Sequence, residues 1–267
     1  MKRFHWLALP VLSIFLIECN NSDQSYSSTS NSSEPSVPSI SYNVVNSLPH
    51  DTAAFTEGLE FYHNTLIESA GLYAKSRLIQ QDPASGKIIK QIKLDPKYFG
   101  EGISILHDTL YQLTYKENVV LVYDARTFNK IKELPYNSGE GWGMTNDGKN
   151  LIVSNGSSNL YFFEPGSFKL LRVQNITENG DNVPNINELE FVNGFIYANQ
   201  WQYNYILKID PSSGQVVGKM DLTDLINRTP GTNSDNVLNG IAYNHDTKKF
   251  YVTGKNWPKM YEIQFAY

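Results

Sequence analysis

The stretch Thr56-Glu57-Gly58-Leu59 introduces a pattern that recurs along the chain: a small or polar residue, an acid or Asn, Gly, and then the hydrophobic start of a strand. Five copies, the last two in altered form, stand at 56–59, 100–103, 139–142, 187–190 and 239–242. They lie about 40 to 50 residues apart, which is the period expected of β-propeller blades.

A second pattern follows each of the first four copies, at 82–87, 124–127, 164–167 and 210–214. In each case an acidic residue ends a strand, and a turn rich in Pro, Gly and Ser leads into the next strand. Short alternating segments lie between the two patterns, for example 110–114 with 119–123 and 195–198 with 205–209. Each has the length of a normal strand, so every repeat has room for four strands.

The last repeat ends at 261–265 and has no following segment to supply its outermost strand. The segment 42–48, before the first repeat, can supply it, and this pairing would close the ring and remove two open edges. We therefore predict an all-β fold: a five-bladed β-propeller over residues 41–267, closed by the N-terminal strand. One short helical insertion is expected at 221–227. A β-helix would need shorter repeats, and a lipocalin-like barrel would not repeat its turns so regularly.

The first residues resemble an export signal. Lys2 and Arg3 precede an apolar stretch at 4–17 that is too short to span a bilayer. Cys19, the only cysteine, follows at the place where a bacterial lipoprotein carries its lipid, although Glu18 replaces the small residue that is usual there. An ordinary cleaved secretory signal is the alternative.

We accordingly expect three parts: a signal peptide at 1–18, a tether at 19–40 that begins with a lipidated Cys19, and the catalytic propeller. The tether is rich in Ser and Asn and has few apolar side chains to offset the entropy of ordering, so it should be flexible. The protein would be a lipoprotein of the periplasm or cell surface, anchored to the membrane through Cys19.

Composition excludes several classes of function. The formal net charge is −5, which does not suggest a nucleic-acid partner. Beyond Cys19 the chain has no cysteine for a disulfide or a nucleophile, and its five His show no metal spacing. A Gly-x-Ser-x-Gly elbow and a phosphate-binding glycine loop are also missing. We expect no cofactor or metal, and a monomer, because a closed ring needs no partner.

The innermost strands of a propeller line its central channel, so the first pattern of each repeat should converge on one axial cavity. The polar residues brought there would be Glu57, Glu101, Glu140, Asn187, Glu188 and Asn239. Trp142, Trp201, Trp257, Tyr115 and Lys255 occupy matching places. The alternative is structural: acids beside Gly can cap backbone N–H groups in turns, and Trp can pack between blades.

At these residues the chain resembles the glutaminyl-peptide cyclotransferases of the plant and bacterial type. The matching stretches are FTEGLEF (55–61), YFGEGI (98–103), YQLTYK (111–116), GEGWGMTNDGK (139–149), NINELEF (185–191), ANQWQ (198–202), LNGIAY (238–243) and VTGKNWPKMYEI (252–263). They cover roughly residues 45–263. The resemblance implies a five-bladed propeller without catalytic zinc. It also implies an acyltransferase that converts the N-terminal glutamine of peptides or proteins to pyroglutamate with loss of ammonia.

The resemblance also implies roles for individual residues. Glu101 matches the family's acid/base. Trp142, Trp201 and the position of Tyr115 match its aromatic pocket, while Asn187 and Lys255 match its polar substrate contacts. Two residues depart from the usual pattern, since members often have Trp in place of Tyr115 and Gln in place of Glu57. These departures affect the expected substrate preference more than the reaction.

The implied reaction suits these side chains. The α-amine attacks its own side-chain carboxamide, so nucleophile and electrophile are already joined. Glu101 can take the amine proton and return it to the leaving nitrogen, while Asn187 or Lys255 stabilises the oxyanion. Two other functions stay open: a non-catalytic propeller that binds a peptide or glycan, and a calcium-dependent hydrolase with Glu57, Asn187 and Asn239 among its ligands.

Overall fold

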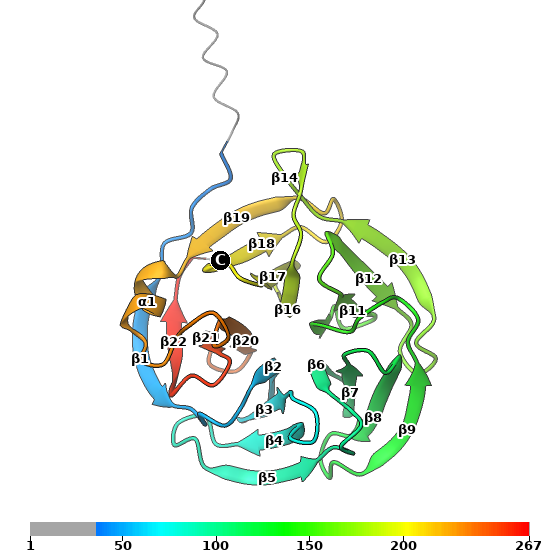
Figure 1. The fold of residues 1–267 in the computed structure, drawn as a ribbon. Helices are drawn as coiled ribbons and strands as arrows, with labels where there is room; N and C mark the ends of the chain where they lie inside the picture. Colours follow the sequence, from blue (N-terminus) through cyan, green and yellow to red (C-terminus); the bar gives the residue numbers. More distant parts are fainter. Residues whose placement is uncertain (1–35, 267) are drawn as a thin grey trace, which may run out of the picture. The chain divides into compact units, whose positions relative to one another are not determined.

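The five repeats form five four-stranded antiparallel sheets, arranged as blades around a central axis (Figure 1). The structure is a computed structural model, and it describes residues 36–266. The first strand of each repeat lies nearest the axis and later strands are added outward, which confirms the predicted propeller. The predicted signal peptide, Cys19 and most of the predicted tether lie outside the described residues.

The strands follow the repeats of the sequence. Blade 1 consists of β2 (Thr56–Tyr62), β3 (Thr65–Ala70), β4 (Arg77–Gln81) and β5 (Ile88–Lys93). Blade 2 consists of β6 (Gly100–Leu106), β7 (Thr109–Thr114), β8 (Val119–Asp124) and β9 (Lys130–Pro135). Blade 3 consists of β10 (Met144–Asn146), β11 (Leu151–Ser154), β12 (Asn159–Phe163) and β13 (Leu170–Asn175). Blade 4 consists of β16 (Ile186–Val192), β17 (Phe195–Gln200), β18 (Tyr205–Ile209) and β19 (Val216–Asp221). Blade 5 consists of β20 (Leu238–Asn244), β21 (Lys249–Gly254), β22 (Lys259–Gln264) and β1 (Asn43–Pro49).

Blade 5 is completed by the N-terminal strand, as predicted. β1 pairs antiparallel with β22, and Leu48 lies opposite Met260. Just before β1, the last residues of the predicted tether bind the edge of blade 4: the Ile40 N–H donates to the Lys219 carbonyl at 2.8 Å. The Lys219 N–H in turn donates to the Pro38 carbonyl at 3.0 Å, so the chain runs from the edge of blade 4 to that of blade 5.

Two smaller elements interrupt the regular order. A hairpin of β14 (Thr177–Glu178) and β15 (Asp181–Asn182) precedes blade 4, and α1 (Thr223–Arg228) lies at the predicted helical insertion. No helix within residues 36–266 is long and apolar enough to cross a membrane.

A β-bulge stands at the first pattern in four of the five blades. In β6, Gly100 pairs with Thr114 and Ile103 pairs with Gln112, so β6 holds one more residue than β7 across this stretch. The same one-residue excess occurs at the start of β2, β16 and β20. A bulge turns neighbouring side chains in different directions, so that one strand can place one side chain in the channel and the next against the adjoining blade.

The glycines of the first pattern allow neighbouring inner strands to approach each other closely. A Cβ atom on Gly102 would lie 2.5 Å from the carbonyl oxygen of Trp142, to which the Gly102 N–H donates at 2.7 Å. A Cβ atom on Gly141 would lie 2.5 Å from the carbonyl oxygen of Thr114, and one on Gly143, directly after this copy of the pattern, 2.0 Å from that of Asn187. The close contact of blades at the axis, and not only a tight turn, therefore explains these glycines.

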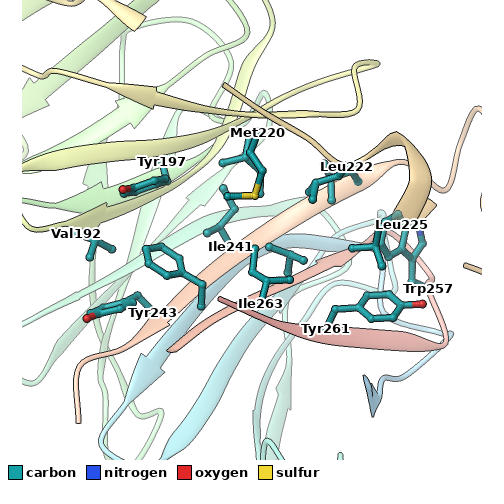
Figure 2. Packing of buried hydrophobic residues seen from close by; sticks show 14 residues of the cluster. Val192, Tyr197, Met220, Leu222, Leu225, Ile241, Tyr243, Trp257, Tyr261 and Ile263 are labelled. Atoms are coloured by element: carbon teal, nitrogen blue, oxygen red, sulfur yellow. The ribbon is translucent and has the colours of Figure 1, made fainter. Parts of the chain in front are cut away.

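Apolar side chains fill the spaces between adjacent blades. The largest such cluster joins blades 4 and 5 and includes Tyr197 and Met220 from one and Ile241 and Ile263 from the other (Figure 2). These buried faces are built mainly from the inner three strands of each blade, and the outermost strands β5, β9 and β13 are largely exposed, whereas the outermost strand β19 contributes Met220. Packing between blades thereby holds the inner strands, and the residues at their starts, around the channel.

Candidate active site

The inner strands begin at one end of the channel, and there they surround a cavity of about 490 Å³. This volume lies within the range of small-molecule sites. Seven predicted site residues line the cavity: Glu57, Glu101, Tyr115, Trp142, Asn187, Trp201 and Lys255. The structure thus brings together one cluster of acids, amide, lysine and aromatic rings from all five repeats.

Two carboxyl groups and one ammonium form the charged centre of the cavity. Lys255 Nζ donates to Glu57 Oε1 at 2.6 Å, and their side chains are only 8% and 3% exposed. The carboxyl of Glu101, a residue that is 5% exposed, lies close enough to that of Glu57 for each to affect the pKa of the other. Because two carboxylates this close repel each other, the pair with one proton is favoured over the fully ionised pair.

The proton of this pair belongs on Glu101. Burial raises the pKa of Glu101 well above its ordinary value, and the neighbouring Glu57 carboxylate raises it further. Burial raises the pKa of Glu57 as well, but the Lys255 ammonium contacts Glu57 directly and opposes that rise, which favours the charge on Glu57 over Glu101. Glu101 is therefore the group of the pair on which the proton is favoured.

Aromatic rings form the wall of the cavity. Trp142 and Trp201 meet edge to face with their ring centroids 5.6 Å apart. Phe99 packs against Tyr115 at 5.6 Å on the other side. Lys255 Nζ lies 4.5 Å from the ring of Phe55. Such rings attract a cation to the side of the cavity where the carboxyl pair lies.

Asn187 adds a polar group that has no partner of its own in the cavity. It is buried, and no group within residues 36–266 donates a hydrogen bond to its Oδ1 atom. Its backbone is held firmly, because Ser154 Oγ donates to the Asn187 carbonyl at 2.7 Å. An unsatisfied buried oxygen beside an open cavity is available to accept a hydrogen bond from a ligand.

The sequence profile of the glutamine cyclotransferase family matches residues 13–265 of this chain. The chain belongs to that family. A glutaminyl-peptide cyclotransferase from Arabidopsis thaliana is 40% identical over 224 residues, which are 83% of this chain and 70% of the relative. The crystal structure of Myxococcus xanthus glutaminyl cyclase superposes with a TM-score of 0.79 at 34% identity, covering 86% of this chain and 98% of that one.

Three residues that we predicted to bind substrate in this glutamine cyclotransferase lie outside the cavity lining. Glu140 accepts from Trp142 Nε1 at 3.1 Å and is paired with Lys116, so it orients an aromatic ring. Asn239 donates to Glu57 Oε2 at 3.2 Å and thus supports the carboxyl pair. These two residues act on the cavity through its lining.

Glu188 is the third of these residues, and for it the structural alternative holds. It is fully buried, and its carboxyl accepts the backbone N–H groups of Leu59 and Ile241 at 3.3 and 2.8 Å. These bonds join blade 4 to blades 1 and 5. The bulge at the start of β16 explains the difference from Asn187, because it turns the two adjacent side chains to different surroundings.

Trp257 is also structural. It is fully buried beside Leu225 and Tyr261 (Figure 2), and its indole N–H donates to the Asn236 carbonyl at 2.8 Å. Its place in the repeat suggested the aromatic wall, but the ring packs into blade 5.

Six lining residues of this glutamine cyclotransferase were not predicted: Phe55, Leu72, Phe99, Gln202, Ser234 and Asp235. Phe55, Phe99 and Gln202 stand within two residues of predicted site residues, so proximity to a predicted site residue was a usable signal. Leu72, Ser234 and Asp235 lie in connections between strands, where no repeat marks them. Within residues 36–266 no group of three or more His, Cys, Asp or Glu side chains is placed to hold a metal ion.

Proposed function

We propose that the cavity cyclises the N-terminal glutamine of peptides or proteins to pyroglutamate and releases ammonia, with Glu101 as the proton carrier. The observation that carries this proposal is the position of Glu101, buried against Glu57 and facing an aromatic cavity. The names of the Arabidopsis and Myxococcus relatives support the same reaction. Asn187 and the pair of Lys255 and Glu57 complete the polar side of the cavity.

Binding of the substrate amine prepares the nucleophile. An α-ammonium group has a pKa of about 7.7–8.0, so much of it is protonated near neutrality. Trp142, Trp201 and the carboxyl pair attract this cation. Because burial and Glu57 raise the pKa of Glu101, transfer of a proton from the ammonium to an ionised Glu101 costs less than transfer to an ordinary carboxylate. The neutral amine is then free to attack.

The cyclisation itself needs one proton to move. The amine nitrogen forms a bond to the side-chain carboxamide carbon, and a tetrahedral oxyanion results. Glu101 gives its proton to the carboxamide nitrogen, the C–N bond breaks, and ammonia leaves. The new ring nitrogen returns one proton to Glu101, so protons balance over the step. We assign Asn187 Oδ1 to accept a substrate N–H group. Lys255 Nζ, which has N–H groups beyond the one bound to Glu57, is assigned to the oxyanion.

The decisive experiment measures ammonia release and pyroglutamyl product from a glutaminyl peptide. We expect the folded Glu101→Gln variant to lose about 10²- to 10⁴-fold in turnover, because a glutamine can bind the substrate but cannot carry its proton. Turnover near that of the wild type in this variant would remove Glu101 from the mechanism.

The same assay separates the other two functions. Loss of wild-type turnover on addition of a chelator would favour the calcium-dependent hydrolase. Tight binding of the peptide without any ammonia release would favour a non-catalytic binding propeller. Cyclisation that is unaffected by chelator is the result expected of the proposed reaction.

We further propose that the chain is exported and anchored through Cys19. The positive residues Lys2 and Arg3, the apolar stretch at 4–17 and the cysteine directly after it support this proposal. Fractionation of cells tests it. The wild-type protein should sediment with membranes and Cys19→Ala should not, whereas equal distribution of the two would contradict lipid anchoring.

A further inference from the structure

His50 is a buried titratable residue that the proposed reaction does not use. It follows β1 directly, and its side chain and that of Glu68 are both 0% exposed. The imidazole Nε2 lies 3.1 Å from Glu68 Oε1 on β3. The imidazole Nδ1 lies 2.6 Å from the backbone carbonyl oxygen of Trp257. The ring therefore bridges blade 1 and the turn between β21 and β22 of blade 5.

The contacts show which hydrogens the ring carries. A carbonyl oxygen can only accept, so His50 Nδ1 must donate to Trp257. Glu68 also accepts from Thr56 Oγ1 at 2.7 Å and from Gln81 Nε2 at 3.1 Å, as an ionised carboxylate does. Burial lowers the pKa of His50, but Glu68 and the bond to Trp257 outweigh this effect, and the net change is a rise.

The groups that face His50 are few. Glu68 is the carboxylate in contact with it, and Asp51, in the segment that carries His50, is the other charged neighbour. Asp51 is paired with Arg77 on β4 at 2.7 Å, which ties that same segment to blade 1.

This network ends on the two backbone segments that carry the charged pair of the cavity. Thr56, which donates to Glu68, immediately precedes Glu57. Trp257, whose carbonyl accepts from His50, stands two residues after Lys255. The buried imidazole of His50 and the buried carboxylate of Glu68 thus connect the backbone segment that carries Glu57 in blade 1 with the segment that carries Lys255 in blade 5.

We propose that His50 is a positioning residue for the cyclisation: through Glu68 and the Trp257 carbonyl it holds the segments of Glu57 and Lys255 at the separation that their ion pair requires. This inference rests on the proposed function. A buried ion pair alone is weak evidence for a role in stability, because well-packed apolar residues in its place are often neutral or stabilising. The network of His50 and Glu68 ends at Thr56 and at the Trp257 carbonyl, next to the two cavity residues Glu57 and Lys255. These contacts favour a role in positioning over a role in stability.

Three variants separate positioning from stability. His50→Leu removes both contacts of the imidazole and leaves Glu68 buried without its cation. The double variant His50→Leu/Glu68→Leu also removes the buried Glu68 charge. We expect it to recover stability, but not the hydrogen-bonded connection between the segments of Glu57 and Lys255. Glu68→Gln keeps this connection, because its amide can donate to Nε2 of a neutral His50 whose Nδ1–H still bonds to Trp257.

A matched control comes from another junction. Tyr62 Oη donates to Asp108 Oδ1 at 2.7 Å and joins blades 1 and 2 outside the cavity lining. Tyr62→Phe removes this bond between blades without touching the cavity, so it should leave kcat unchanged.

We expect kcat, expressed per folded molecule, to fall about 10- to 100-fold in His50→Leu and in the double variant, as for a small misplacement of catalytic groups. Glu68→Gln should stay within a few fold of the wild type. The acid limb of the pH profile should move to higher pH in the double variant, because the Lys255 charge that lowers the pKa of Glu101 would no longer be held in place.

Wild-type kcat and an unshifted pH profile in a folded double variant would overturn the positioning role. Equal losses in Tyr62→Phe would do the same, since they would show a general effect of loosened blades. Should the wild-type protein release no ammonia, the proposed function fails by itself. Calorimetric measurement of glutaminyl-peptide binding then tests the role of His50. We expect the double variant to bind the peptide at least several fold more weakly than Tyr62→Phe does. Equal Kd values in the two variants would contradict the positioning role.

Discussion

Glu57, Glu101 and Lys255 form one buried cluster of titratable groups beside the aromatic cavity. Burial raises the pKa of Glu57, Lys255 contacts Glu57 and opposes that rise, and burial and Glu57 together raise the pKa of Glu101. The carboxyl at position 57 therefore sets the pH at which Glu101 can act, although it is not placed to carry the proton itself. Glutamine, which members of the family often have at this position, would lack that effect.

Replacement of Glu57 by Gln is expected to move the acid limb of the kcat/KM profile to lower pH. The Glu57 charge disfavours ionisation of Glu101, so its removal lowers the pKa of Glu101, and burial still keeps that pKa above the ordinary value. The Gln carbonyl oxygen can still accept from Lys255. At pH values where protonation of Glu101 slows the wild type, Glu57→Gln should thus have the higher kcat/KM. Measurement of kcat/KM for both proteins between pH 5 and 9 tests this.

Glu140→Gln provides the matched control for this experiment. This substitution also removes one negative charge that raises the pKa of Glu101, but the effect of Glu140 on that pKa is smaller than the effect of Glu57. The Glu140 side chain is partly exposed and is paired with Lys116. A smaller shift than that of Glu57→Gln is expected. If the two variants shift the profile equally, or if Glu57→Gln moves it to higher pH, the carboxyl pair does not work as described.

Which residues face the cavity could be predicted only in part. The repeated pattern correctly pointed to Glu57, Glu101, Asn187 and Lys255, because equivalent positions of the blades meet at one axis. It did not distinguish Asn187 from its neighbour Glu188, since both stand in the same copy of the pattern. Their different directions arise from a bulge, and a bulge depends on pairing with the next strand.

Strands were predicted best where alternation and turn residues agree. The predicted segments 110–114 and 119–123 correspond to β7 and β8, and the predicted helical insertion corresponds to α1. The hairpin β14–β15 was not predicted, because each of its strands has only two residues and no alternation can be seen over that length. β10 likewise keeps only three residues, although its pattern resembles those of longer inner strands.

The closing strand β1 offers a direct test of ring closure. Leu48 is 8% exposed and packs with Leu59, Tyr251 and Met260, which come from blades 1 and 5. Leu48→Ala should destabilise the fold by about 2–5 kcal/mol, as for other truncations of buried leucine. In a domain of this size each kcal/mol lowers the thermal midpoint by about 2–4 °C.

Val45→Ala is the control on the same strand. Val45 is 53% exposed, so its truncation should change the free energy of unfolding by less than about 0.5 kcal/mol. Equal effects of the two substitutions in urea titrations would mean that β1 does not seal the contact between blades 5 and 1.

Considered as a whole, the propeller buries several carboxyl groups along its channel without a cation beside each. Desolvation raises the pKa of Glu60 to about 8, and burial raises the pKa values of Glu188 and Glu190 well above the ordinary range. Their oxygens accept backbone N–H groups of neighbouring inner strands, such as Ile105 for Glu60 and Tyr243 for Glu190. These bonds hold the blades together whether or not the carboxyl is charged.

The stability of the fold should consequently increase as the pH falls from 8.5 to 5. A carboxyl with a raised pKa keeps its proton in the folded state where the unfolded chain has lost it. Its stabilising effect is thus complete below the unfolded value of about 4.5 and is lost as the pH rises through about 8. The raised pKa of His50 acts in the same direction. Acids with lowered pKa values, such as Asp108, oppose this trend only below about pH 4. Thermal midpoints should thus rise by several degrees over this range.

Glu60→Gln should flatten this dependence, because its amide oxygen still accepts from Ile105 and cannot ionise. Glu133→Gln is the control: Glu133 has a lowered pKa and faces Lys130, so it remains ionised throughout the range. A thermal midpoint of the wild type that falls between pH 8.5 and pH 5 would contradict the assignment of protonated carboxyls to the channel.

The pairing of β1 with β22 also has a consequence during synthesis. β1 leaves the ribosome early, and its partner β22 follows more than two hundred residues later. At about 5–20 residues per second, β1 waits on the order of 10 to 40 s for a partner. During that time the nascent chain displays an unpaired strand and an incomplete blade. Early translation products of this protein should thus expose a strand edge that can pair with other chains.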